Sequence, residues 1–442
     1  MIPGTCNIYS TLRTTYHMRN YYLKVMNLVK EYWIYIFAVA SEASALLVNF
    51  SLFALIQHHY GPEQLSLYMI IRRTISMFLP AVMLGVQISL IKHIGAITDQ
   101  RKIISYIWFG ITLPLTLALA MLMTGAAAPD LLSRIFLGNQ KYSAYMVPLL
   151  FLVLSTALAQ AVVAISKGLH RIFLASLIYV IFFSLGPLCA YFLSSSLSGF
   201  LSVYAFMLLT GGIAILLHFM TSFENKAPVL KGHVEFITFG IKGAGSDFLM
   251  MFLLWLPPYI MASTNAITMS GYFSLIMSLV LVSASPLSPI GSAMMPKVAR
   301  ALQTNSGAEL RTLFTKLAKL FLLIAIPAFL ASLMLFGTVA KYLLHDGLAL
   351  GNRAAAMMLT TSVPVSAYFG LRNVLDVGYS PLRNFYNIFI ALAVFLSCFF
   401  SLLFFISPVL IRIANVVAFT AAMWTLGVLT VYYSYVLYRR TA

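Results

Sequence analysis

Charged residues, and acidic residues above all, are scarce in this chain. Its 442 residues include only 11 Asp and Glu against 28 Lys and Arg, and charged residues make up 9% of the sequence. A soluble domain carries about 25% charged residues, so this composition excludes an ordinary soluble fold. The few charges that lie inside apolar segments therefore become the first places to look for function.

Cysteine is also rare, and enzyme motifs are missing. Cys6, Cys189 and Cys398 lie far apart, and two of them fall in apolar segments, which favours neither a disulfide framework nor a metal site. The chain has no P-loop, so ATP is not the expected energy source. We expect no cofactor, no bound metal and no enzymatic activity. The first 30 residues are polar and lack the apolar core of a cleavable signal peptide.

Long uncharged apolar stretches dominate what remains. No Asp, Glu, Lys or Arg occurs from Ile172 to Phe223 or from Phe248 to Pro296. About 20 apolar residues cross the ~30 Å hydrocarbon core as a helix, so each stretch predicts a pair of spans. The whole chain predicts an all-α integral membrane protein with about twelve transmembrane helices. We place the spans at 33–57, 64–92, 103–127, 143–166, 172–194, 199–220, 246–263, 267–295, 316–338, 354–377, 384–406 and 413–437.

The basic residues predict the orientation. Twenty of the 28 Lys and Arg fall in loops on the side of the N-terminus and five in loops on the other side; Arg72, Arg73 and Arg372 lie within predicted spans. Loop Lys and Arg mark the cytoplasmic side. Both termini are therefore expected to be cytoplasmic, and the basicity indicates topology, with no nucleic-acid partner.

The two halves of the chain have similar residues at corresponding positions. Tyr68 and Lys92 of the second span correspond to Tyr272 and Lys297 of the eighth, at an offset of 204–205 residues. Two copies of six spans have the same orientation and are related by an axis along the membrane normal, as in some transporters. We expect a pseudo-two-fold parallel repeat of two six-helix lobes. The predicted parts are a cytoplasmic segment 1–32, an N-terminal lobe 33–220, a cytoplasmic linker 221–245 and a C-terminal lobe 246–442.

Three segments carry a family resemblance. Residues 60–68, YGPEQLSLY, resemble the LGPEEFGLY hallmark that follows the first span of polysaccharide transporter (O-antigen) flippases, with Ser66 in place of the hallmark glycine. Residues 78–90, FLPAVMLGVQISL, are similar to the second span of that family. Residues 167–175, KGLHRIFLA, are similar to its fourth loop. The family belongs to the multidrug/oligosaccharidyl-lipid/polysaccharide exporter (MOP) superfamily.

The resemblance implies a function. It implies a flippase that moves undecaprenyl-pyrophosphate-linked oligosaccharide, an O-antigen or capsule repeat unit, across the bacterial inner membrane by alternating access. The implied partners are the lipid-linked oligosaccharide, membrane lipids, and the polymerase and glycosyltransferases of the same pathway. Two alternatives stay open, a cation-coupled drug or metabolite antiporter of the same superfamily and a membrane glycan polymerase or ligase.

Arg72 and Arg73 are the sharpest functional candidates. They lie about a third of the way into the second span, where a charge is costly unless it faces water or an anion. Neighbouring helical residues point about 100° apart, so we expect one arginine to face a cavity and the other a neighbouring helix or the cavity edge. We assign both to substrate binding; snorkelling to the headgroups is the alternative.

Four further charges are candidates of lower rank. Glu42 is the only charge in the first span and either pairs with Arg72 or Arg73 or binds a coupling proton. Arg372 and Asp376 are spaced i, i+4 and predict an ion pair near the cytoplasmic end of the tenth span. Asp247 is interpreted as a first-turn acid at the start of the seventh span, with ion coupling as the other reading.

The topology is directly testable. In a cysteine-free background, a cysteine placed at Gln303 should resist a membrane-impermeant maleimide added to intact cells, because the loop that contains it is predicted to be cytoplasmic. Labelling of this cysteine from the periplasmic side would contradict the orientation.

Overall fold

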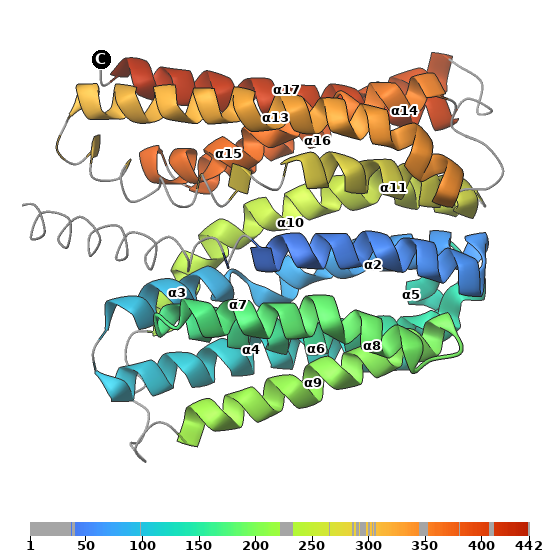
Figure 1. Ribbon diagram of the computed structural model, residues 1–442, viewed down its shortest axis with the longest axis horizontal. Helices are drawn as coiled ribbons and strands as arrows, with labels where there is room; N and C mark the ends of the chain where they lie inside the picture. The colour runs from blue at the N-terminus through green and yellow to red at the C-terminus, as the bar shows by residue number, and fades with distance from the viewer. Residues whose placement is uncertain are drawn as a thin grey trace, which may run out of the picture.

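The structure is a computed structural model, and it consists of long helices laid roughly side by side (Figure 1). It describes residues 37, 40–97, 99–221, 233–264, 266–284, 306–343, 352–379, 381–405 and 411–440, together with seven single positions between 287 and 304. The predicted segment 1–32, residues 222–232 of the predicted linker, Lys297 and Gln303 lie outside the described residues.

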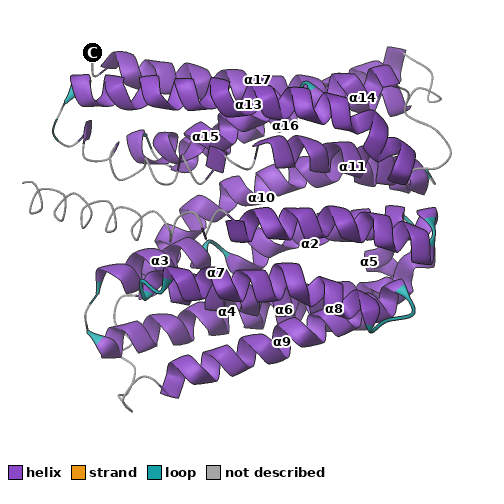
Figure 2. Ribbon diagram, viewed as in Figure 1, coloured by secondary structure: helices purple, strands orange, loops and turns teal. Residues whose placement is uncertain are grey.

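Within the described part every regular element is helical, as Figure 2 shows. Twelve helical segments are long and apolar enough to cross a membrane, which confirms the predicted fold class. The first span is Ala40–Tyr60. The elements that follow are α2 Pro62–Met83, α3 Val86–Ala96, α4 Gln100–Ala127, α5 Pro129–Phe136, the 3₁₀ segment Gln140–Tyr145, α6 Met146–Gly168, α7 Ile172–Val180, the π-helical segment Ile181–Leu185, α8 Gly186–Phe192, α9 Leu197–Thr221, α10 His233–Ser263, α11 Ile267–Ala284, α13 Gly307–Leu343, α14 Asn352–Leu359, α15 Ser362–Gly378, α16 Pro381–Phe405 and α17 Ile411–Arg440.

The helices form two lobes. Helices α2 to α9 lie together in one, and α13 to α17 in the other (Figure 1). Helices α2 and α3 on one side and α10 and α11 on the other make the interface, since α2 packs against both α10 and α11 and α3 packs against α10. The interface therefore joins the second span to the eighth, its predicted repeat counterpart, and to the seventh.

Two predicted boundaries need correction. The predicted second span, 64–92, is broken, because Leu84 and Gly85 adopt left-handed φ angles of 44° and 71° between α2 and α3. The seventh helix begins at His233 and not at 246, so the second half of the predicted linker is helical. Its first turns pack on α3, where Ser89 Oγ donates to Phe236 O at 2.9 Å. A Cβ on Gly85 would lie 2.6 Å from the carbonyl carbon of Gly240, so only glycine fits this crossing.

The Gly-Pro-Glu motif starts the second span. Gly61 has a φ of 90°, which favours glycine, and Pro62 occupies the first turn of α2, where its missing N–H costs nothing. Glu63 accepts from Lys141 Nζ at 3.0 Å, and Gln64 accepts from Tyr145 Oη at 3.0 Å. The motif thus anchors α2 to the segment before α6 and has a structural role here.

The lobes are closed against each other at the predicted periplasmic end. A Cβ on Gly271 of α11 would lie 2.8 Å from Ser66 Cα of α2, so the two backbones nearly touch. A Cβ on Gly138 would lie 2.7 Å from the backbone nitrogen of Ser263 at the end of α10. Trp255 Nε1 donates to Thr74 Oγ1 at 3.2 Å across the same interface. The lobes are therefore in close contact at this end.

Candidate functional site

Three connected cavities lie at the lobe interface and inside the N-terminal lobe. The arginine chamber, about 330 Å³, is lined by Glu42, Arg72, Arg73, Ser274 and Ser278 among others. The inner chamber, about 440 Å³, extends toward the predicted cytoplasmic end and is lined by residues that include Gln87, Gln160, Asp247, Arg372 and Asn373. The N-lobe pocket, about 290 Å³, is lined by residues that include Asn49, Tyr68, Thr156, Tyr179 and Tyr204. Ser76 borders all three.

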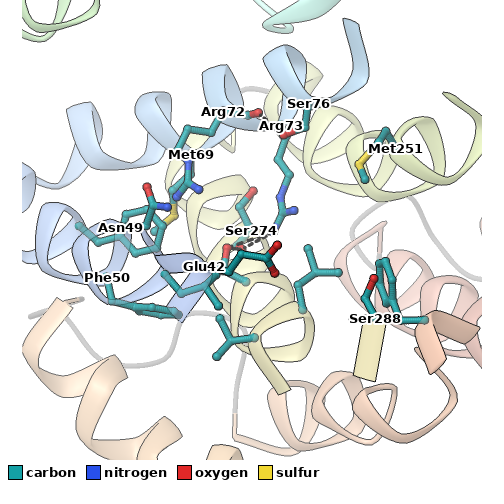
Figure 3. Close-up of a pocket in the computed structure, with 16 residues that line it drawn as sticks. Glu42, Asn49, Phe50, Met69, Arg72, Arg73, Ser76, Met251, Ser274 and Ser288 are labelled. Carbon is teal, nitrogen blue, oxygen red and sulfur yellow. Dashed lines mark hydrogen bonds between the residues drawn. The ribbon is translucent and has the colours of Figure 1, made fainter. Parts of the chain in front are cut away.

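Arg73 crosses from one lobe to the other. Its Nη2 donates to Ser274 O at 3.2 Å and to Ser278 Oγ at 3.0 Å, both on α11. Figure 3 shows the side chain reaching from α2 into the arginine chamber. The two acceptors are neutral, so they satisfy part of the guanidinium and leave its charge available to an anion.

Arg72 lies on the N-lobe side of the same chamber. Its Cζ is 5.1 Å from the ring centroid of Phe53 and 5.9 Å from that of Tyr68. Aromatic faces within about 6 Å stabilise a guanidinium by about 0.5–2 kcal/mol, which offsets part of the cost of placing the charge here. Arg72 borders both the arginine chamber and the N-lobe pocket. Both arginines face the cavity, one toward each lobe.

Glu42 lines the arginine chamber with the two arginines (Figure 3). Glu42 is an exposed residue. In the described part of the chain it forms no ion pair within 4 Å, where the pairs found are Lys141–Glu63 and Arg372–Asp247. The predicted pairing with Arg72 or Arg73 is therefore not formed in this conformation.

The position of Asp247 and the partner of Arg372 both differ from the predictions. Asp247 lies inside α10, more than three turns from its start, and not in a first turn. Its Oδ1 accepts from Arg372 Nη2 of α15 at 2.6 Å, with side-chain exposures of 29% and 17%. The predicted partner of Arg372 was Asp376, one turn along the same helix. The ion pair instead joins α10 to α15 and lines the inner chamber.

Asp376 has a different partner. Its Oδ1 accepts from Asn384 Nδ2 of α16 at 2.7 Å, and the same amide donates to Arg372 O at 2.9 Å. Asn384 is 1% exposed. Asp376 therefore ties α15 to α16 behind the chamber wall and is not among the residues that line the chambers.

Several polar residues of the site were missed at the sequence level. Gln87 Nε2 donates to Gln160 Oε1 at 2.6 Å, which links α3 to α6 beside the inner chamber. Thr156 and Gln160 lie one turn apart on α6, an otherwise strongly apolar span. A polar pair at i, i+4 in such a span is a signal that could have identified them.

Comparisons with known proteins give the fold. Neither a family model nor a curated protein sequence matches this chain. Among solved structures, an inward-facing multidrug resistance MATE family transporter of the MOP superfamily superposes with a TM-score of 0.74 at 13% identity, over 90% of this chain and 95% of that one. An outward-facing multidrug resistance MATE family transporter of the MOP superfamily gives 0.70 at 14% identity, over 92% and 94%. A MOP superfamily transporter from Pyrococcus furiosus, reported as having a binding pocket of reverse polarity that suggests a different function, gives 0.69 at 15% identity, over 92% and 96%.

These similarities show that the chain has the fold of MATE-type transporters over most of its length.

The Asp247–Arg372 pair predicts a stability effect. Asp247→Asn should lower the free energy of unfolding by about 1–3 kcal/mol, since it leaves the Arg372 charge without its partner in a partly desolvated site. Thermal melts of the purified protein measure this. The double variant Asp247→Asn, Arg372→Gln should recover most of the loss, because two neutral amides can still hydrogen-bond. A double variant as unstable as the sum of both single variants would contradict the pairing.

Proposed function

We propose that the protein is an alternating-access transporter whose central cavity binds an anionic, lipid-linked substrate. The observation that carries this is the pair of consecutive arginines on α2, both of which face one membrane-embedded chamber. Among the described residues, three arginines and two acids, Glu42 and Asp247, are the charged residues that line the arginine and inner chambers. Because Asp247 is already paired with Arg372, the remaining balance is two arginines against Glu42.

A pyrophosphate suits this arrangement. A guanidinium contacts phosphate oxygens in a planar, two-pronged geometry and keeps its charge when desolvated. The groups that accept hydrogen bonds from Arg73 are neutral, the carbonyl of Ser274 and the hydroxyl of Ser278. The modest positive excess permits release as well as binding, which transport requires.

The substrate that we propose is an undecaprenyl-pyrophosphate-linked oligosaccharide of a bacterial inner membrane. The pyrophosphate and glycan would enter the chambers from the predicted cytoplasmic end while the polyprenyl chain stays in the lipid. Separation of the Ser66–Gly271 contact and closure of the other end would then expose the headgroup to the opposite side.

A second candidate is a cation-coupled drug or metabolite antiporter. It is supported by the similarity to multidrug resistance transporters and by two acids, Glu42 and Asp247, on the cavity walls. For such a role the acids would carry the coupling cation or attract a cationic drug, and the arginines would oppose the drug. The charge balance of the arginine chamber favours the anionic substrate.

Neutralising both arginines tests the proposal. Arg72→Ala with Arg73→Ala should abolish lipid-linked surface glycan while the protein remains at its normal level in the membrane, and Lys at both positions should restore glycan only in part because an ammonium lacks the planar fork. Glycan blots and membrane immunoblots of a complemented strain give the two readouts. Normal surface glycan in the double-alanine strain would exclude the proposal.

A variant of Glu42 tests whether this side chain carries a coupling proton. If it carries the coupling proton, Glu42→Gln should remove the dependence of transport on a pH gradient while the variant still inserts and folds. Transport into proteoliposomes with and without an imposed gradient measures this, with Glu63→Gln, at the predicted periplasmic surface, as the matched control. Unchanged gradient dependence in Glu42→Gln would exclude the coupling role.

A further inference from the structure

The N-lobe pocket differs in chemistry from the chambers beside it. Four aromatic rings line it, Tyr68, Tyr179, Phe183 and Tyr204, and its polar groups are neutral amides and hydroxyls. Among the described residues that line it, Arg72 is the only charged one, and it stands at the border with the arginine chamber. A pocket of aromatic faces with a few neutral hydrogen-bonding groups is built to orient an uncharged polar ligand.

Much of the hydrogen-bonding capacity of this pocket is unused. Asn49, Thr156 and Tyr179 have no hydrogen-bond partner within the part of the chain that the structure describes, although Thr156 is only 7% exposed. Gln160 accepts through Oε1 from Gln87 and keeps its amide N–H groups for another partner. Thr156 is buried, whereas Asn49, Gln160 and Tyr179 are half-buried, and all four line the pocket. Polar groups that converge on a pocket orient its ligand by hydrogen bonds, so these side chains point to a ligand with hydroxyl groups.

The local backbone of the fifth span is also unusual. Residues Ile181–Leu185 form a π-helical turn between α7 and α8, and Phe183 within this turn lines the pocket. Tyr204 Oη donates to Phe182 O at 3.1 Å in the same turn. Single π turns inside α-helices frequently mark functional sites. This turn forms part of the pocket wall and is a second observation, separate from the polar side chains.

We propose that the N-lobe pocket binds a neutral sugar ring, the one joined directly to the phosphate held by Arg72 and Arg73. This inference rests on the proposed function and adds a specificity site to it. The connection is geometric, since Arg72 and Ser76 border both the pocket and the arginine chamber. A volume of about 290 Å³ is at the small end of ligand pockets, so it accommodates one ring, and further sugars extend into the inner chamber.

The residues have distinct tasks in this site. The faces of Tyr179 and Phe183, whose ring centroids lie 4.8 Å apart, would pack against the C–H face of the ring. Thr156, Gln160 and Asn49 would hydrogen-bond its hydroxyl or acetamido groups. A site that hydrogen-bonds a hydroxyl rejects an analogue without it, because its own groups are then left unpaired. The pocket would thus select among lipid-linked glycans by their first sugar.

Binding of sugar phosphates to the purified, full-length protein tests this. Dissociation constants are measured for glucose 1-phosphate, galactose 1-phosphate and N-acetylglucosamine 1-phosphate, each against inorganic phosphate. At least one sugar phosphate should bind about tenfold or more tightly than inorganic phosphate, as expected of one or two added hydrogen bonds and a packed ring. In the variant Thr156→Val, Tyr179→Phe this advantage should disappear while the affinity for inorganic phosphate stays unchanged.

The controls separate this inference from the proposed function. Thr210→Val, Tyr432→Phe makes the same chemical changes at two exposed positions of α9 and α17 and should bind like the wild type. Equal affinity of all three sugar phosphates and inorganic phosphate in the wild type would overturn the sugar site and leave the anion site standing. An advantage that survives in Thr156→Val, Tyr179→Phe would overturn it too. Absence of binding by every one of these anions would contradict the proposed function, and the sugar site with it.

Discussion

Two adjacent guanidinium groups in the middle of a membrane-spanning helix must be stabilised by something other than lipid. A charge at this depth costs several kcal/mol when it faces hydrocarbon. The fold meets this constraint with the second lobe, because Arg73 reaches Ser274 and Ser278 on α11, and with aromatic rings, because Arg72 lies over Phe53 and Tyr68. The lobe interface is thus arranged around these two charges.

The same interface has the features that alternating access needs. Its contacts include the close approach of Gly271 to Ser66 at the predicted periplasmic end and the hydrogen bond from Trp255 to Thr74, the residue after Arg73. Buried apolar side chains of α2, α10 and α11 surround these contacts in one continuous core. The bond from Arg73 to Ser278 spans the lobes at the cavity itself. An anion that engages Arg73 would compete with that bond and so couple binding to lobe movement.

Hydropathy predicted the twelve spans and placed Arg72 and Arg73 inside the second of them, because both depend on local composition. The break at Leu84–Gly85 was missed, since an apolar run looks continuous whatever its φ angles, and it depends on the approach of Gly240 from another helix. The i, i+4 spacing predicted Asp376 as the ion-pair partner of Arg372, whereas helix packing places Asp247 of α10 beside it. Thr156 and Gln160 were overlooked because two polar residues barely change the hydropathy of an apolar span.

The central claim is that the cavity is selective for anions, and ligand binding to the purified protein tests it most directly. The melting temperature is measured in parallel with inorganic pyrophosphate and with a cationic dye, because a ligand that binds only the folded state raises that temperature. The account predicts that pyrophosphate stabilises the wild type and not the variant Arg72→Gln, Arg73→Gln, and that the dye stabilises neither. Stabilisation of the wild type by the cationic dye alone would contradict it.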